Sequence, residues 1–368
     1  MGVDIKISER QETPNWLVYG TPVFTIVAAL AVSALALLAI DVSPVATYNQ
    51  MFVETLTDMS NISTVLVRAA PLIFAGLGVY LPMKAGLWNI GAEGQLLMGA
   101  IVGTWIALNV SLPPVFLIPL MLFGAGLAGG LWAFIPALLR AKWGINEIIT
   151  TLLFTFIAVD IQLYLVRGPI QGGFGGFPQT DLLPDASQFP LLTGMDIPLA
   201  LLFALVAVGG VYLLMKKTRL GFQITFVGSN ADAADQAGMS RYRLYLITLV
   251  VGGAMAALAG ISEIAGNQGR LHASFEPGYG FTAIPIALLG RNGALRVLLA
   301  ALFFALLFVG GDRVSVALEV PSALIDIIQA LVILFLITAE FIQQYNVDIS
   351  LGKDTDDAVL ETEVATDG

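Results

Sequence analysis

Ten apolar segments recur along this sequence, and they constrain its fold more than any other feature. They cover residues 17–40, 62–83, 86–110, 112–139, 145–166, 198–215, 244–265, 281–290, 294–311 and 322–342. A helix needs about 20 apolar residues to cross the hydrocarbon core of a bilayer, and all but one of these segments approach or exceed that length. The composition agrees, because only 12% of the 368 residues are charged, whereas soluble domains contain roughly 25%. We therefore predict an all-α, polytopic membrane protein with about ten transmembrane segments.

Polar ends and loops divide the chain around a membrane domain that we place at residues 17–342. Residues 1–16 are too polar for a cleavable signal, so the first apolar segment is predicted to be a membrane helix. Residues 343–368 form an acidic tail that we expect to be disordered. With a cytoplasmic N-terminus and alternating segments, 13 of the 17 lysines and arginines lie inside. The positive-inside rule thus predicts a multi-pass protein of the cell membrane with both termini cytoplasmic, an external loop at residues 167–197 and a cytoplasmic loop at residues 216–243.

One apolar segment contains polar side chains at membrane depth. Residues 86–100, GLWNIGAEGQLLMGA, carry Asn89, Glu93 and Gln95 among several glycines. A carboxylate in hydrocarbon costs at least about 2.5 kcal/mol and normally faces a water-filled or protein-lined cavity. Two interpretations follow: a tight helix-packing seam in which Glu93 is paired with a neighbour, or a broken helix that lines a translocation path.

The eighth apolar segment, residues 281–290, is too short to cross a bilayer as a straight helix. The surrounding sequence, FEPGYGFTAIPIALLGR, is interrupted by glycine, as residues 86–100 are in the first half of the chain. Paired broken helices in two halves of a transporter indicate a midplane site between pseudo-repeats. We therefore expect pseudo-repeated halves with a broken helix in each. Residues 45–61, in contrast, are expected to form a polar external connection.

Further residues near these segments are candidates for a substrate path. They are Asn146, Glu147, Asn267, Gln268, Tyr279, Phe281, Asp326 and Gln329. The first two open a helix, where the carboxylate could instead favour the helix N-terminus. The next four flank the broken segment, where amides can bond a base or sugar and aromatic rings can stack on it, unless they form an ordinary outer loop. The last two share a helix face, as a packed pair or as cavity lining. We expect Glu263 to form a solvated bridge with Arg270.

The cytoplasmic loop contains a short helical pattern that ends at a glycine. Asp232-Ala233-Ala234, three further residues and Gly238 are typical of a helix with a C-cap glycine. Its small side chains allow it either to seat in a groove of a partner or simply to connect two spans. The positions that carry the docking hypothesis are Asn230, Asp232, Ala233, Ala234, Gly238 and Met239.

This pattern resembles the EAA coupling motif of ABC-importer permeases, with Asp232 in place of glutamate. With GLWNIGAEGQLLMGA, GINEIITTLL, GFQITFVGSNADAADQAGM and GRLHASFEPGYGFTAIPIALLGR in series, the chain resembles nucleoside and simple-sugar permeases of the branched-chain amino acid and ribose permease superfamily, from about Ile62 to Glu340. The resemblance implies a second permease subunit in a homo- or heterodimer, cytoplasmic ATPases and an external substrate-binding lipoprotein.

The residue inventory argues against chemistry within this chain. It has no G-x-x-x-x-G-K-[ST] phosphate loop, so ATP hydrolysis is expected on another polypeptide. With no cysteine and one histidine, we expect no metal site, no cofactor, no enzymatic activity and no nucleic-acid partner. Two alternatives stay open. A branched-chain amino acid permease would use Glu93 for the ammonium group, and an ion-gradient transporter would use Glu93 and Asp326 as ion sites.

Overall fold

The computed structural model describes residues 3–9, 14–173, 176–192 and 197–351. It separates into two compact units, one of residues 1–40 and 326–368 and one of residues 41–325. The larger unit contains nearly all of the candidate functional residues.

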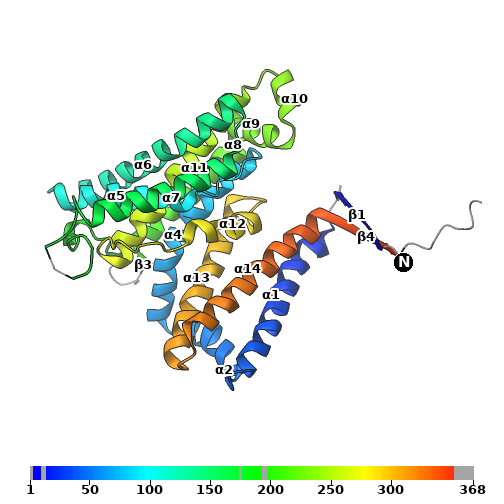
Figure 1. The fold of residues 1–368 in the computed structure, drawn as a ribbon, viewed down its shortest axis with the longest axis horizontal. Helices are drawn as coiled ribbons and strands as arrows, with labels where there is room; N and C mark the ends of the chain where they lie inside the picture. The colour runs from blue at the N-terminus through cyan, green and yellow to red at the C-terminus, as the bar shows by residue number, and fades with distance from the viewer. Residues whose placement is uncertain (1–2, 10–13, 174–175, 193–196, 352–368) are drawn as a thin grey trace, which may run out of the picture. The chain divides into compact units, whose positions relative to one another are not determined.

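Each of the ten predicted segments coincides with a helix (Figure 1). These helices are α1 (Asn15–Leu38), α4 (Met59–Lys84), α5 (Ala92–Asn109), α6 (Pro114–Trp143), α7 (Glu147–Val166), α8 (Leu199–Lys217), α11 (Arg241–Glu263), α12 (Tyr279–Leu289), α13 (Ala294–Ala317) and α14 (Ser322–Gln344). Within the described residues, seven helices are long and apolar enough to cross a membrane. An all-α, polytopic membrane protein is therefore confirmed, whereas the count of ten spans stays a prediction. The three helices outside the seven are α1, which counts only as a shorter apolar helix over Val23–Leu38, α5, which is polar at its start, and α12, which has only 11 residues.

Shorter elements connect these helices. They are α2 (Pro44–Tyr48), the π-helix η1 (Asn49–Glu54), α3 (Thr55–Thr57), the 3-10 helix η2 (Asp185–Ser187), β2 (Leu191–Leu192), β3 (Ile197–Pro198), α9 (Arg219–Ser229), α10 (Ala231–Gln236) and the π-helix η3 (Ile264–Gln268). Residues 45–61, which were expected to form a polar external connection, are largely helical rather than a loop, and their external position stays a prediction. Ser43 caps α2, and the fully buried Met51 of η1 lies against Gly310 of α13.

The smaller unit contains a two-stranded antiparallel sheet. Strand β1 (Val3–Glu9) pairs with β4 (Tyr345–Leu351), in a register that runs from Val3 opposite Leu351 to Glu9 opposite Tyr345. Both sequences alternate apolar and polar residues, VDIKISE and YNVDISL, as paired strands commonly do. The structure thus differs from the expected disorder over residues 345–351. Residues 352–368 of the predicted tail lie outside the described residues.

In the larger unit, α11 packs against α4, α5 and α6. Glycines allow this close approach, because a Cβ atom added at Gly260 would overlap the carbonyl oxygen of Leu96, and one at Gly253 would lie 2.7 Å from the carbonyl oxygen of Gly129. Small residues commonly let membrane helices approach in this way. Gly253 and Gly260 are therefore packing positions of α11.

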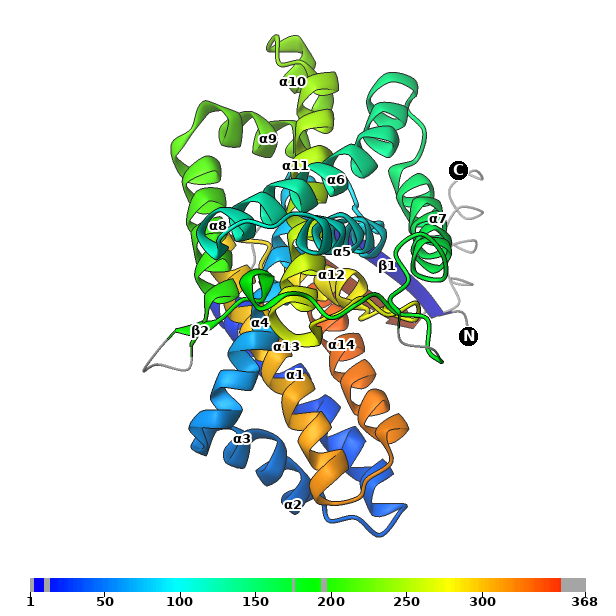
Figure 2. The same ribbon diagram turned by 90° about the vertical axis from the view of Figure 1, so that its left-hand side faces the viewer.

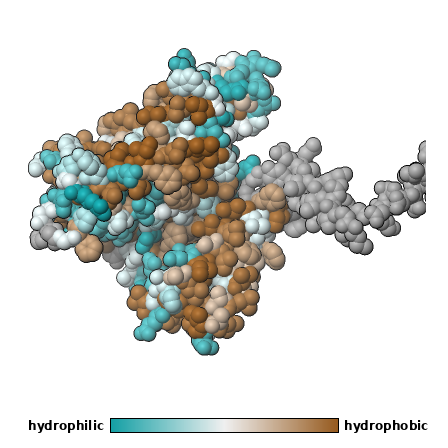
Figure 3. Space-filling model, in the orientation of Figure 1, coloured by the Kyte–Doolittle hydropathy of each residue, from teal (hydrophilic) through white to brown (hydrophobic). Residues whose placement is uncertain are grey.

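The outward faces of the neighbouring helices are apolar. Figure 3 shows hydrophobic surface over α5, α6 and α7 and hydrophilic surface around α10. Phe123 and Leu131 of α6 and Phe156 of α7 are each more than half exposed. Side chains of this kind are stable against lipid or a partner helix, which agrees with a membrane-embedded unit.

Replacing Gly260 with alanine tests the glycine seam. We expect Gly260→Ala to lower the free energy of unfolding by about 1–3 kcal/mol, because the added methyl group forces α11 away from α5. The measurement is the unfolding temperature of the purified protein in mild detergent. Gly210→Ala is the matched control, since a Cβ atom there meets nothing within 4 Å. Equal unfolding temperatures for the two variants would contradict the packing role.

Candidate functional site

The connection between α4 and α5 is a non-helical break at residues 85–91. Gly86 in this break has a φ of 77°, a left-handed conformation that favours glycine. Asn89 and Gln95 exchange two side-chain hydrogen bonds of 2.8 Å each, and the Asn89 amide also donates to the carbonyl of Gly78 in α4 at 3.1 Å. Both amides are buried. The structure therefore places Asn89 and Gln95 in a packing contact that fixes the break to α4.

Glu93 connects the two broken segments. It lies in the first turn of α5 and is 2% exposed. One carboxylate oxygen accepts from the backbone N–H of Gly278 at 2.9 Å, and the other from Gly280 at 2.6 Å. Because Gly278 is the N-cap of α12, the carboxylate lies at the N-termini of both helices, where an anion is favourable. The structure thus agrees with the interpretation in which Glu93 is paired with a neighbour, and the neighbour is the start of α12.

Tyr279, the first residue of α12, is held through its side chain as well. Its hydroxyl accepts from Arg68 at 2.8 Å and donates to Glu263 at 3.3 Å. Arg68 also forms an ion pair with Asp312 of α13 at 3.2 Å. A charged network thus joins α4, α11, α12 and α13 next to the Glu93 contact. Phe281 does not join it and is 44% exposed.

Glu263 does not form the expected bridge with Arg270. Its first carboxylate oxygen accepts from the side-chain amides of Asn267 at 2.7 Å and Gln268 at 3.1 Å. The π-helix η3 is the physical reason, because it continues α11 and places residues four and five positions later over the carboxylate. The predicted residues Asn267, Gln268 and Tyr279 therefore meet around one buried carboxylate.

Asp326 and Gln329 belong to the smaller unit. They lie three residues apart on α14, where Asp326 is exposed and Gln329 is half-buried. No hydrogen bond or ion pair of either side chain is described, and their role stays a prediction.

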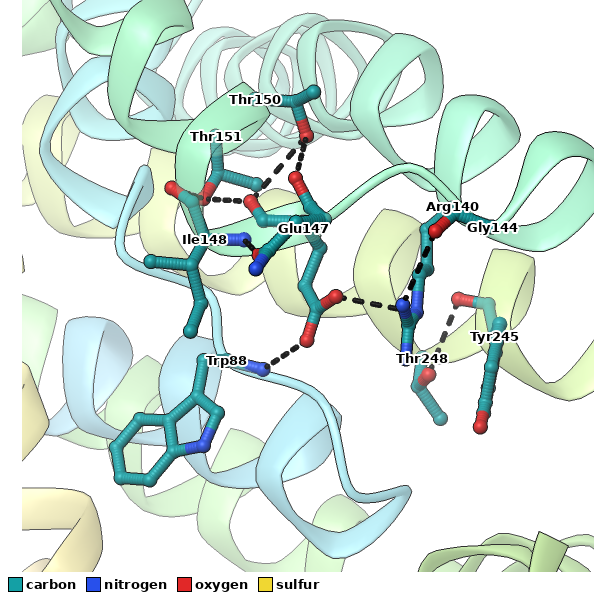
Figure 4. A network of polar contacts seen from close by, with 10 residues as sticks. Trp88, Arg140, Gly144, Glu147, Ile148, Thr150, Thr151, Tyr245 and Thr248 are labelled. Carbon is teal, nitrogen blue, oxygen red and sulfur yellow. Dashed lines mark hydrogen bonds and ion pairs between the residues drawn. The ribbon is translucent and has the colours of Figure 1, made fainter.

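A second network surrounds the start of α7 (Figure 4). Asn146 caps this helix by accepting from the backbone N–H of Ile148 at 2.8 Å. Glu147 follows, 5% exposed, and its carboxylate pairs with Arg140 at 3.1 Å and accepts from the backbone N–H of Trp88 at 3.2 Å. Glu147 lies in the first turn of α7, as the helix-start interpretation expected. Glu147 does more, since it joins the end of α6 and the start of α7 to the break before α5.

The glycine-ended helical pattern of residues 232–238 forms α10 and ends as predicted. Asn230 caps the helix by accepting from the backbone N–H of Ala233 at 2.9 Å. Gly238 has a φ of 77°, and the backbone N–H of Met239 donates to the carbonyl of Ala234 at 2.9 Å. This is a Schellman motif, in which a left-handed glycine closes the helix. Figure 2 shows α10 at one end of the larger unit, beyond α9.

α10 is anchored on one side and exposed on the other. Arg241 of α11 pairs with Asp232 and Asp235 at 2.7 Å each. Ala234 is fully buried in an apolar cluster that also contains Ala85 and Leu87 of the break. The glycine-stopped helix therefore shares its hydrophobic support with the break.

α9 touches the break directly through its backbone. A Cβ atom added at Gly228 would overlap the carbonyl oxygen of Lys84 and lie 3.0 Å from the backbone nitrogen of Gly86. The sequence analysis missed Gly228, and it also missed Arg68 and Arg140 as partners. The positions of the two arginines could have predicted these contacts, because an arginine within or beside an apolar segment usually has a buried partner.

Three pockets differ in the charge of their lining. One of about 450 Å³ is lined by Ser60, Ser63, Thr64, Phe189 and Asn267, with aliphatic residues and a glycine completing it. Another of about 430 Å³ includes Arg167, His272 and Glu276. A third of about 290 Å³ includes Asp312 and Arg313. Asn267 is thus a predicted substrate-path residue that lines an uncharged pocket.

These features define a polytopic membrane protein in which two broken helices meet at a buried carboxylate and lie close to an exposed short helix. Residues 61–337 match the family described as branched-chain amino acid transport system, permease component, and the chain belongs to this family. The family recognised from the sequence motifs is confirmed.

Curated relatives are permease proteins of ABC transporters. The chain is 59% identical to the glucose ABC transporter permease protein TsgB13 of Haloferax volcanii, over 97% of each chain. It is 31% identical to the guanosine ABC transporter permease protein NupP of Bacillus subtilis, over 85% of this chain and 91% of the relative. It is also 31% identical to the nucleoside ABC transporter permease protein NupB of Lactococcus lactis, over 86% and 89%. No solved structure matches.

Replacing Glu93 with glutamine tests whether this side chain holds the start of α12 or contacts the ligand. We expect Glu93→Gln to lower the free energy of unfolding by about 1–3 kcal/mol, because an amide nitrogen would face a backbone N–H of α12 and leave that buried donor unpaired. Thermal unfolding in detergent, together with uptake, measures the effect. The exposed Glu276→Gln is the control. Impaired uptake at unchanged stability would contradict bracing and favour direct ligand contact.

Proposed function

We propose that this chain is the membrane-spanning permease subunit of an ABC importer and forms part of the translocation path for a simple sugar or nucleoside. The substrate class is supported by the names of the relatives, which are permeases for glucose, guanosine and nucleosides. Because the sequence has no phosphate loop, ATP hydrolysis lies on separate subunits.

The observation that carries the coupling proposal is the position of α9 and α10 against the break. α10 presents an exposed face to a cytoplasmic partner and places Ala234 in the cluster that supports residues 85 and 87. Gly228 of α9 touches the backbone of the same break. The break leads into Glu93, and Glu93 bonds the start of α12. A displacement of α10 by the ATPase would thus reach both broken helices through consecutive contacts.

The other partners follow from the proposed class. A second permease subunit, identical or different, would complete the path, and an external substrate-binding lipoprotein would deliver the ligand. The charge distribution supports a cell-membrane location with both termini in the cytoplasm. In this orientation the loop of residues 167–197 is external, and its backbone bonds residues 265–273 at Leu271, Gly269 and Ala265. These paired loops would form the surface that meets the lipoprotein.

The contacts of Glu93 do not favour the two alternatives. An amino acid substrate would require a carboxylate for its ammonium group, and an ion-gradient transporter would require one for its ion. Both oxygens of Glu93 already accept backbone hydrogen bonds within the protein. A neutral substrate makes no such demand on this side chain.

Replacing Gly228 with alanine tests the coupling path. We expect Gly228→Ala to keep the ATPase bound but to reduce uptake of D-glucose or guanosine roughly fivefold or more, because the methyl group displaces α9 from the break. Gly210→Ala, which has open space for its methyl group, should behave as the wild type. Uptake by cells and co-purification of ATPase activity are the measurements.

Deletion of residues 232–238 provides the second arm of this experiment. The deletion should abolish ATPase association, whereas Gly228→Ala should not. A chain that keeps its ATPase after the deletion, or that transports normally without any ATPase, would overturn the proposed function.

A further inference from the structure

In the uncharged pocket of about 450 Å³, a buried carboxylate outside the lining determines how one lining amide is oriented. Asn267 lines this pocket, and its amide nitrogen donates to the buried carboxylate of Glu263. A carboxylate only accepts hydrogen bonds, so the amide can present only its nitrogen to Glu263. The carbonyl oxygen of Asn267 therefore points away from Glu263. Gln268 is oriented by the same carboxylate in the same way.

Residues with hydroxyl groups line the same pocket from another element. Ser60, Ser63 and Thr64, on the first turns of α4, line the same pocket. The hydroxyl of Thr64 donates to the carbonyl of Ser60 at 3.0 Å, so its oxygen retains capacity to accept a further hydrogen bond. Phe189, whose backbone N–H donates to the carbonyl of Ala265 at 2.8 Å, supplies an apolar wall. The pocket thus combines hydrogen-bonding groups with an aromatic side chain.

We infer that this pocket is a subsite for a neutral, hydroxyl-rich ligand, in which Asn267 accepts a hydrogen bond from a ligand hydroxyl and Glu263 is the positioning residue. The inference rests on the proposed function and adds the location and polarity of one ligand contact. The volume of the pocket lies within the range of small-molecule sites, about 300–1,000 Å³.

The lining also selects the ligand class. Among the described residues, those that line this pocket are uncharged, whereas the other two pockets contain charged side chains. A zwitterionic amino acid would leave both of its charges unpaired here, which is costly. A sugar or the ribose of a nucleoside has hydroxyl donors for Asn267 and apolar C–H groups for Phe189.

The subsite is connected to the broken helix through Glu263. The second oxygen of this carboxylate accepts from Tyr279, the first residue of α12. A ligand bonded to Asn267 therefore lies one side chain away from a group that holds α12. Ligand binding and the position of this helix thus share one carboxylate.

Direct binding to the purified transporter complex, without the external binding protein, tests this inference. Radiolabelled D-glucose, D-ribose, guanosine and L-leucine are the probes, in a scintillation proximity assay. For whichever of D-glucose, D-ribose and guanosine binds, we expect Asn267→Leu to weaken binding roughly 3- to 10-fold, because one hydrogen bond is lost. Thr64→Val should act in the same direction. Asn109→Leu, at the exposed end of α5, is the control and should bind as the wild type.

The double variant gives the sharpest readout of the positioning role. If Glu263 acts on the ligand through Asn267, then Glu263→Gln and Asn267→Leu should be non-additive in binding. Unchanged affinity in both Asn267→Leu and Thr64→Val, or preferential binding of L-leucine, would overturn the subsite. These outcomes leave the proposed function intact when uptake still requires this chain and its ATPase, so the two failures can be distinguished.

Discussion

The larger unit depends on the bonding of Glu93 to the start of α12. Within a membrane, a helix N-terminus has unpaired N–H groups and no water to satisfy them, and a carboxylate there is equally unfavourable alone. In this protein the Glu93 carboxylate accepts hydrogen bonds from the backbone N–H groups of Gly278 and Gly280 at the start of α12, so both groups are satisfied. Glycine is required at position 278 because its φ of 70° is left-handed, and at position 280 because a Cβ atom there would overlap the backbone of Glu93. The contact between Glu93 and the start of α12 therefore satisfies polar groups of both broken helices.

Two other buried carboxylates in the larger unit, those of Glu147 and Glu263, also accept hydrogen bonds from groups of the protein. Glu147 satisfies the backbone of Trp88 while pairing with Arg140, and Glu263 satisfies two amides and a phenol near Arg68. Each buried carboxylate bonds groups from more than one element. The polar residues therefore connect particular helices, while the glycines let helices pack closely. The break before α5 contacts α9 and α10 on one side, and through Glu93 of α5 it is connected to the start of α12.

Local features were predictable from the sequence, and long-range partners were not. The glycine stop at Gly238 and the packing glycines of α11 follow from short patterns. The partners of Glu93 lie 185 and 187 residues away, and sequence spacing cannot identify them. Glu263 was assigned to Arg270 because an α-helix was assumed to end before residue 267, whereas a π-helix continues it. The pairing of β1 with β4 was missed because its two strands are at opposite ends of the chain.

The family description names branched-chain amino acids, whereas the uncharged lining of the pocket at Asn267 favours a neutral ligand. A fold shared by permeases for amino acids, sugars and nucleosides fixes the helices but leaves specificity to a few side chains. Here the buried carboxylate between the broken helices is occupied by backbone donors, and the pocket at Asn267 is lined by uncharged groups. Such an arrangement pairs neither end of a zwitterion. It offers a hydroxyl-bearing ligand an acceptor whose direction is fixed by Glu263, and the same carboxylate holds α12.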